Sequence, residues 1–322
     1  MGRRWLWTLA LFGIAMMAID GYAQTFPTKP VMLMVAYPPG GSTDVGARIV
    51  ASIAEKELGQ PIVVLNKPGA GGQVGWTELA RQKPDGYYIG FINLPIINTV
   101  ILDPERKAVF SIEDFTPIIN HVLDPGVVYV RPDSPFKSFR DLLEEAKKRP
   151  GELRAGTTGI LGDDHMAILM VEEAAGVKFR IVHFDGDSPQ ATALMGQQID
   201  VSFLNVGGMT PRVKSGQMRP LVVMDKERSK FYPDVPTTVE LGFPTVLSAS
   251  TRGIAGPRGL PPSIVSTFQT VFKKAMEDPE HIKRMDHAGL AIKVMYGAEY
   301  ESYYKNVHEI AKRLVEKARK AP

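Results

Sequence analysis

The chain has 322 residues, of which 44% are hydrophobic and 23% charged, an ordinary composition for a folded globular protein. At roughly 150 residues per domain, this length predicts two domains. The 38 basic and 35 acidic residues are scattered along the chain, so the formal charge is only +3 and no basic tract points to a nucleic-acid partner. The sequence contains no cysteine, which excludes disulfides, thiolate zinc sites, iron–sulfur clusters and cysteine nucleophiles.

The first residues have the pattern of an export signal. Two arginines precede an apolar run over residues 5–19, and Gly21 and Ala23 place small residues at the two positions that a signal peptidase reads. We therefore expect cleavage between Ala23 and Gln24. A membrane anchor is the alternative, but a run of about 15 apolar residues is shorter than the roughly 20 that span a bilayer.

Strand and helix patterns alternate along the first part of the mature chain. Short apolar runs that end in glycine or proline are typical of buried parallel strands, and apolar residues three or four positions apart are typical of helices. Ser42 or Thr43 is expected to cap the first helix, which Gly59 ends. The predicted order is a strand at 31–36, a helix up to 58, a strand at 62–65, a helix through 76 and 79, and a strand at 87–92. This order predicts the opening of a doubly wound sheet.

The remainder of the chain continues the alternation and predicts a second lobe. Strands are expected at 127–130, 153–155, 177–184, 199–203 and 221–224, and helices near 142–146, 165–175, 189–197, 262–276 and 298–320. The helix near 142 has an N-cap signature at Ser138 and Asp141. We predict an α/β fold with one lobe at 24–126 plus 247–322 and an inserted lobe at 127–246. Each lobe is expected to be a doubly wound sheet flanked by helices, with the ligand cleft between the lobes.

Two glycine-rich loops are candidates for binding an anion. The loop at residues 37–44, YPPGGSTD, joins a strand to a helix N-terminus, where unpaired backbone N–H groups meet the positive end of the helix dipole. Ser42 and Thr43 add hydroxyl donors there. The loop at 156–159, GTTG, has the same character in the second lobe. One such loop per lobe predicts a carboxylate clamp, while a plain capped loop remains the alternative for each.

Other motifs argue against an enzyme. The glycines at 69–75 follow a strand, but a dinucleotide-binding GxGxxG pattern would need glycine in place of Val74. The sequence contains neither a P-loop nor a GxSxG nucleophile pattern. Side chains of the kinds that bind metals occur at Asp163, Asp164, His165, His183 and Asp185. Nothing in their spacing fixes a coordination geometry, so we expect no catalysis, cofactor or metal.

Several different motifs are spread along essentially the whole mature chain. They are YPPGGSTD at 37–44, NKPGAGG at 66–72, PDGY at 84–87, GTTG at 156–159 followed by His165, ALMGQQID at 193–200 and KSGQMRPL at 214–221. Together they resemble the tripartite tricarboxylate transporter substrate-receptor family, also called Bug-type receptors. The resemblance implies a type II periplasmic-binding-protein fold of the Venus-flytrap kind, which closes on a small organic anion in the periplasm and delivers it to membrane permease subunits.

The resemblance also implies which residues hold the ligand. In such receptors two loops hold a ligand carboxylate through backbone N–H groups, hydroxyls and ordered water. The first-lobe loop reads Pro-Pro-Gly-Gly followed by Ser or Thr, and the second-lobe loop has two Ser or Thr residues between two glycines. The ligand-binding residues expected here are Tyr37, Pro39, Gly40, Gly41, Ser42, Thr43, Thr157, Thr158, Asp185, Ser188, Asn205 and Arg252.

Three departures from the family pattern bear on the ligand. Leu204 stands where relatives often have aspartate, which disfavours a ligand that carries an ammonium group. The sequence FDGD replaces a common YKGG, and its acids Asp185 and Asp187 argue against a tricarboxylate such as citrate. Arg252 stands where an aromatic pair is usual, and it either meets a distal carboxylate or faces solvent at a hinge. We expect a mono- or dicarboxylate, aliphatic or aromatic.

Two other functions stay open at this point. The chain could be an exported sensor whose liganded form docks on a membrane receptor, or a secreted enzyme on the same two-lobed scaffold. The transport receptor is favoured over the enzyme because no base, nucleophile or metal set occurs at a plausible spacing.

Overall fold

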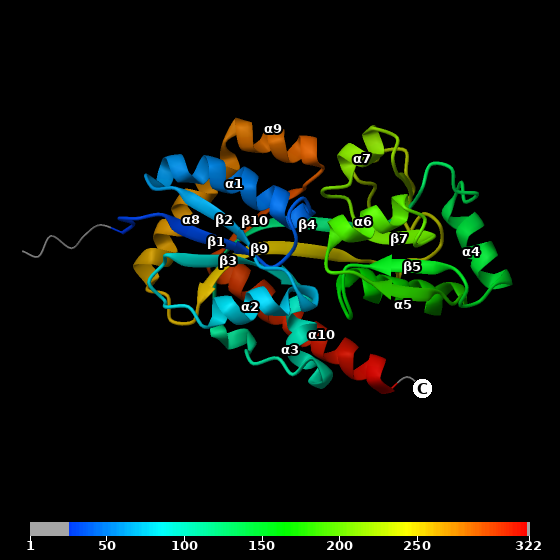
Figure 1. The fold of residues 1–322 in the computed structure, drawn as a ribbon, viewed down its shortest axis with the longest axis horizontal. Helices are drawn as coiled ribbons and strands as arrows, with labels where there is room; N and C mark the ends of the chain where they lie inside the picture. Colours follow the sequence, from blue (N-terminus) through cyan, green and yellow to red (C-terminus); the bar gives the residue numbers. More distant parts are fainter. Residues whose placement is uncertain (1–25, 321–322) are drawn as a thin grey trace, which may run out of the picture.

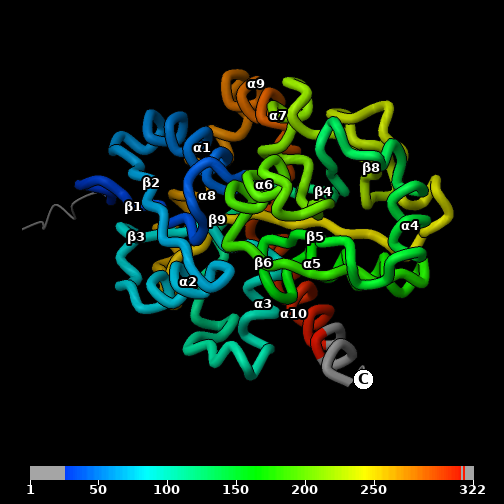
Figure 2. The backbone as a smooth tube through the Cα atoms, turned by 45° about the vertical axis from the view of Figure 1, so that its right-hand side comes forward, coloured from blue at the N-terminus to red at the C-terminus, as the bar shows by residue number. Residues whose placement is uncertain are grey.

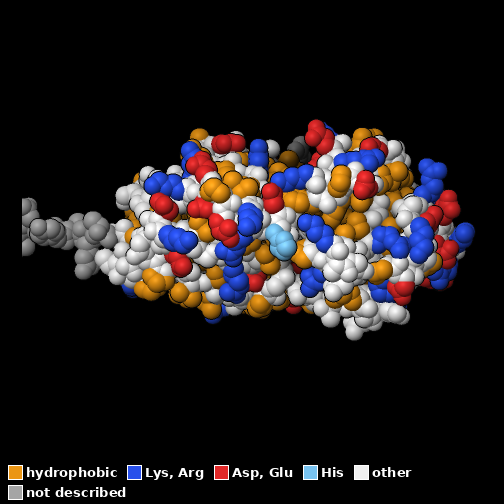
Figure 3. Space-filling model, turned by 90° about the horizontal axis from the view of Figure 1, so that it is seen from above, with side chains coloured by type: hydrophobic (Ala, Val, Ile, Leu, Met, Phe, Trp, Pro, Cys, Tyr) orange, Lys and Arg blue, Asp and Glu red, His pale blue; other side chains and the backbone are white. Residues whose placement is uncertain are grey.

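The computed structural model describes residues 26–320 and has two lobes that lie side by side along its long axis (Figure 1). The expected export signal, with its cleavage site after Ala23, lies outside the described residues. Within residues 26–320, no helix combines the length and the apolar composition needed to cross a bilayer. Charged side chains of both signs are mixed over the face shown in Figure 3, which agrees with their scattered positions in the sequence.

The first lobe is built on a mixed sheet. Its strands are β1 (Val31–Val35), β2 (Ile62–Asn66), β3 (Tyr88–Leu94), β4 (Phe115–Val130), β9 (Ala249–Pro257) and β10 (Ile292–Tyr296). The order is β2-β1-β3-β9-β4, and β10 pairs with the other edge of β4. β1 pairs in parallel with β2 and β3, while β9 is antiparallel to both of its neighbours. Because β1 reads VMLMV and lies inside the sheet, it buries apolar side chains on both faces.

Helices cover both faces of this sheet. They are α1 (Ser42–Leu58), α2 (Gln73–Ala80), α3 (Ile96–Leu102), α8 (Pro262–Glu277), α9 (Pro279–Ala288) and α10 (Gly297–Lys320), with single 3₁₀ turns at Ala70–Gly72, Pro104–Arg106 and Ile112–Asp114. In Figure 1, α1 and α9 lie above the sheet, and α2, α3 and α10 lie below it. α1 ends at Gly59, whose φ of 72° is the left-handed conformation typical of a helix C-cap.

The second lobe repeats this layered arrangement. Its strands are β5 (Arg154–Thr157), β6 (Arg180–His183), β7 (Val201–Asn205) and β8 (Arg219–Val223), and its helices are α4 (Phe139–Lys148), α5 (Asp163–Ala175), α6 (Asp187–Met195) and α7 (Thr210–Lys214). β5 is parallel to β6 and β7, and β7 and β8 are antiparallel to β4. Separate apolar clusters pack on the two faces of this sheet, one with α4 and α5 and the other with α6.

One strand belongs to both lobes. The first part of β4 pairs with β9 and β10, and its last part, from Gly126, pairs with β7 and β8. The ladder with β9 ends at the pair Pro125 and Ala249, next to the pair Gly126 and Asn205 that begins the ladder with β7. Figure 2 shows the yellow segment around β9 running beside β4 from one lobe to the other. The lobes are therefore joined by adjacent strands.

The predicted two-lobed α/β fold is confirmed, with local corrections. The cap expected at Ser42 or Thr43 is wrong, because Gly41 holds the N-cap position and Ser42 is the first helical residue. The strand predicted at 127–130 is only the last part of β4. The lobe boundaries at 126/127 and 246/247 stay a prediction, and β4 runs through the first of them.

Candidate functional site

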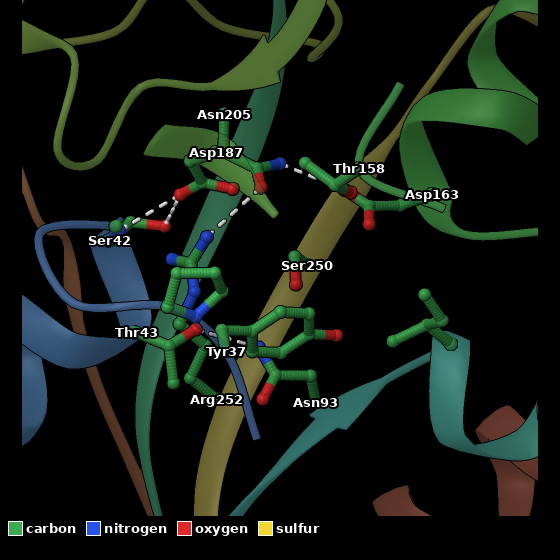
Figure 4. A pocket seen from close by; sticks show the side chains of 13 residues that line it. Tyr37, Ser42, Thr43, Asn93, Thr158, Asp163, Asp187, Asn205, Ser250 and Arg252 are labelled. Atoms are coloured by element: carbon green, nitrogen blue, oxygen red, sulfur yellow. Dashed lines mark hydrogen bonds between the residues drawn. The ribbon is translucent and has the colours of Figure 1, made fainter. Parts of the chain in front are cut away.

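A small cavity lies between the lobes, with about 20 Å³ of free space (Figure 4). It is walled by the loop before α1, the end of β3, the start of α3, loops of the second lobe, and the strands that join the lobes. The lining residues are Tyr37, Pro38, Gly41, Ser42, Thr43, Asn93, Ile96, Thr158, Asp163, Asp187, Asn205, Ser250 and Arg252. Most of them are polar, so the cavity offers many hydrogen-bonding groups in little space.

Asp44, in the first turn of α1, holds the loop that precedes this helix. The carboxylate of Asp44 accepts hydrogen bonds from the Gly40 backbone N–H at 2.9 Å, from Asn66 Nδ2 at 2.9 Å and from Arg48 Nε at 3.0 Å. Burial alone would raise the pKa of Asp44, but these hydrogen bonds and the Arg48 charge hold it below its usual value. The carboxylate therefore stays ionised and keeps the start of α1 directed at the cavity.

A carboxylate from the second lobe lies at the start of α1. Asp187 Oδ2 accepts a hydrogen bond from the Ser42 backbone N–H at 2.9 Å and another from the Ser42 hydroxyl (Figure 4). Next to it, the side chain of Asn93 donates to Thr43 Oγ1 at 2.9 Å, and Asn93 Oδ1 is buried without a hydrogen-bond partner. The first-lobe wall of the cavity thus combines a helix N-terminus with an unpaired amide oxygen.

Arg252 is the centre of a buried polar chain. Its Nη1 contacts Asp124 Oδ2 at 2.5 Å, and its Nη2 donates to Asn205 Oδ1 at 3.0 Å. Asn205 Nδ2 in turn donates to Asp163 Oδ2 at 2.9 Å. The Arg252 side chain is 3% exposed, so the alternative in which it faces solvent at a hinge is wrong. Its guanidinium Nε, which is buried, has no hydrogen-bond partner.

Buried acids lie in and behind the cavity wall, and burial favours their neutral form. Burial raises the pKa of Asp124 to about 6 despite the adjacent Arg252 charge. Burial also raises the pKa of Asp163 and of Asp164, which accepts from the Thr158 hydroxyl at 2.8 Å. Asp163 and Asp124 thus share one buried arginine, Arg252, as their nearby positive charge.

The structure brings together seven of the twelve residues expected to bind the ligand, all of which line the cavity: Tyr37, Gly41, Ser42, Thr43, Thr158, Asn205 and Arg252. The other five, Pro39, Gly40, Thr157, Asp185 and Ser188, are not among the lining residues. The Thr157 hydroxyl donates to the Gly159 carbonyl, and Asp185 is exposed and accepts from the Gly71 backbone N–H at 3.0 Å. Their role as ligand-binding residues stays a prediction.

Six lining residues were not among those expected: Pro38, Asn93, Ile96, Asp163, Asp187 and Ser250. Asn93 could have been found, because it stands at the carboxyl end of a predicted strand, where ligands bind in open α/β sheets. In the sequence, Asp163 stands out only as one of several side chains of the kinds that bind metals. Within residues 26–320, however, no group of three or more histidine, aspartate or glutamate side chains is placed to hold a metal ion.

A cleft between two α/β lobes, lined by loops of both and by the strands that join them, defines a two-lobed solute-binding protein. The model of the family described as "Tripartite tricarboxylate transporter family receptor" matches residues 46–319. The chain belongs to this family, whose members are solute-binding receptors and not enzymes. The resemblance read from the sequence motifs is thereby confirmed.

Individual relatives agree with this assignment. A protein of Cupriavidus necator, "UPF0065 protein in gbd 5'region", is 31% identical over 313 residues, which are 96% of this chain and 93% of that protein. The solved structure of periplasmic binding protein BugD is 28% identical, with a TM-score of 0.84 over 91% of this chain and 98% of that chain. An R. palustris protein solved with adipate is 26% identical, with a TM-score of 0.81 over 91% of this chain and 96% of that one.

Proposed function

We propose that the chain is a periplasmic receptor that captures a small organic mono- or dicarboxylate between its lobes and delivers it to a tripartite membrane permease. The observation that carries the proposal is the N-terminus of α1, whose Ser42 backbone N–H points at the cavity and donates to a carboxylate oxygen. A helix N-terminus favours an anion through its unpaired N–H groups and its dipole. The adipate in one relative's structure supports a carboxylate ligand for this chain as well.

The remaining lining groups suit the polar end of such a ligand. Arg252 Nε is a buried donor without a partner, and the Tyr37 hydroxyl extends across the cavity in Figure 4. Burial and nearby acids raise the pKa of Tyr37 well above its usual value, so its hydroxyl keeps the proton that it can donate. Opening of the lobes would admit the ligand body, because the closed cavity has room for little more than one water molecule.

The test is calorimetric titration of the mature protein with succinate, adipate, benzoate, citrate and glutamate, with adipamide as the uncharged control for adipate. We expect binding of one carboxylate class and none of adipamide. A ligand at 100 times its dissociation constant would also add about 2.7 kcal/mol to the free energy of unfolding. Loss of cellular uptake of the same carboxylate on gene deletion would support delivery to a permease. Binding of adipamide as tightly as adipate would contradict a carboxylate receptor.

A further inference from the structure

The start of α1 is capped by the opposite lobe. Within its own segment, the N-cap residue Gly41 has no side chain to accept the first free N–H groups of the helix. That role falls to Asp187, the first residue of α6, which is separated from Ser42 by 145 positions in sequence. Asp187 accepts both the backbone N–H and the hydroxyl of Ser42 through one oxygen, Oδ2.

Asp187 fills the place that the proposed function gives to the ligand. A carboxylate bound at the start of α1 would use the Ser42 N–H and hydroxyl, and both already donate to Asp187. A Cβ atom added at Gly41 would lie 3.7 Å from the Asp187 carboxylate, so the side chain packs against the loop itself. With Asp187 in this position, the cavity keeps about 20 Å³, which is too small for a dicarboxylate of four to six carbons.

The charges around the cavity add to the same conflict. Arg252 is the one basic side chain among the residues that line it, and its two terminal nitrogens contact Asp124 and Asn205. Asp163 and Asp187 line the same cavity. A dianionic ligand that entered beside Asp187 would bring more negative charge next to two carboxylates, and like charges at such short range repel. Movement of Asp187 away from Ser42 removes one of them.

The same contact bridges the lobes. Ser42 belongs to the first lobe and Asp187 to the second, so the hydrogen bonds exist only when the lobes are closed. A bound ligand normally supplies the contacts that hold two such lobes together. Here a side chain of the protein supplies a carboxylate in the same position.

We propose that Asp187 is an internal competitor of the ligand: its carboxylate occupies the anion position at the start of α1, ties the two lobes together in the closed form, and must leave before a ligand carboxylate can bind. This inference rests on the proposed function and assigns Asp187 the role of setting ligand affinity. In the closed form Asp187 occupies the anion position, and displacing it costs free energy. The receptor therefore binds its ligand more weakly than the same cleft without Asp187 would.

The experiment compares the full mature protein with Asp187→Gly and with the conservative variant Asp187→Asn. Small-angle X-ray scattering measures the radius of gyration without ligand, and calorimetry measures the affinity for adipate. Asp234→Asn is the control, because it removes one acidic charge from an exposed position of the second lobe that does not line the cavity. Circular dichroism verifies that each variant is folded.

We expect Asp187→Gly to have a larger radius of gyration than the wild type without ligand, and to bind adipate about tenfold more tightly, a change of about 1.4 kcal/mol. Asp187→Asn should shift both quantities in the same direction by less, and Asp234→Asn should match the wild type. An unchanged radius of gyration in Asp187→Gly overturns the inference, whatever adipate does. Equal or weaker adipate binding by that variant also overturns it. If adipate binds neither the wild type nor any variant while the radius still increases, adipate fails as the ligand of the proposed function, and the same comparison is made with succinate, where equal or weaker binding by Asp187→Gly overturns the inference.

Discussion

Gly208 of the second lobe packs directly against Ser42 at the start of α1, so that a Cβ atom added at Gly208 would lie 3.1 Å from the Ser42 Cα. Gly208 also has a φ of 78°, a left-handed conformation that costs other residues about 1–2 kcal/mol. It lies three residues beyond the end of β7, at the point where the second lobe meets the first. Close approach of the lobes therefore depends on the missing side chain.

Gly208→Ala is expected to weaken ligand binding by hindering closure. The added methyl group meets the backbone of Ser42 only when the lobes are closed, so we expect adipate affinity to fall at least fivefold, measured by calorimetry. The matched control is Gly216→Ala. Gly216 has a similar φ of 73°, but an added Cβ there meets nothing within 4 Å. Both variants should lose about 1 kcal/mol of stability, and equal adipate affinity in the two would contradict the closure argument.

Arg252→Met is expected to lower the free energy of unfolding by about 3 kcal/mol, because it leaves the buried Asp124 carboxylate without its partner. Urea unfolding measures the loss. The double variant Arg252→Met with Asp124→Asn should recover part of it, since neither charge then remains. The exposed pair of Arg228 and Glu240 is the control, and Arg228→Met should cost less than about 1 kcal/mol. A loss for Arg252→Met as small as the control would show that the buried pair contributes little.

Tyr37→Phe is expected to weaken adipate binding about fivefold while leaving the fold intact. The variant removes a hydroxyl that lines the cavity and keeps the ring that packs edge-on against Trp76. Calorimetry measures the affinity. Tyr88→Phe is the control, because the Tyr88 hydroxyl donates to Glu78 at 2.6 Å outside the cavity. Adipate affinity within twofold of the wild type for Tyr37→Phe would exclude its hydroxyl from binding.

Two buried histidines should make stability depend on pH. His121 and His281 face each other with 2.9 Å between their Nε2 atoms. Burial lowers the pKa of His281 to about 4 and that of His121 well below its usual value. Below pH 6.5 these two histidines bind protons in the unfolded chain but stay neutral in the folded chain. These histidines therefore stabilise the fold above pH 6.5, and that stability is lost as the pH falls toward 4.

His281→Gln tests this dependence, since glutamine can still hydrogen-bond to His121 but does not titrate. Between pH 6.5 and 4.5, we expect the free energy of unfolding of the variant to change less steeply with pH, by up to about 1.4 kcal/mol per pH unit. Urea unfolding at several pH values measures the slopes. His287→Gln, at an exposed position of the same helix, controls for the loss of any histidine. A slope identical to the wild type for His281→Gln would show that His281 does not titrate differently on folding.

Local sequence patterns predicted most of the helices and strands, but they missed α3, α7, α9, β9 and β10 and found only the last part of β4. The periodicity of α1 and its end at Gly59 are local, and the structure has the helix over Ser42–Leu58. β4 extends over 16 residues because β9, β10, β7 and β8 pair with it, and these partners are 70 or more positions away in sequence. The local sequence of β4 does not reveal partners at that distance, so it does not predict the length of the strand.

The candidate site was predicted in part for a similar reason. Ser42 and Thr43 begin α1, and Thr158 lies in the loop between β5 and α5; the glycine-rich composition of both segments predicts a helix start. Asn93 and Ser250 lie on β3 and β9, and they reach the cavity because these strands pair as neighbours in the sheet. Asp185 and Asp187 look equivalent in sequence. The turn at Gly186, with a φ of 112°, starts α6 at Asp187 and separates it from the exposed Asp185.

The pairing of Pro125 with Ala249 has a topological consequence. In the first-lobe sheet these two residues are cross-strand neighbours, so the chain leaves that lobe and returns to it at a single point. The entire second lobe is thus equivalent to the loop of one β-hairpin, enlarged until it carries a sheet and helices of its own. Replacing that loop with a tight turn would close β4 and β9 into an ordinary hairpin without cutting another strand of the first lobe. One wall of the cleft is, in this sense, an insertion in the turn between two adjacent strands of the first lobe.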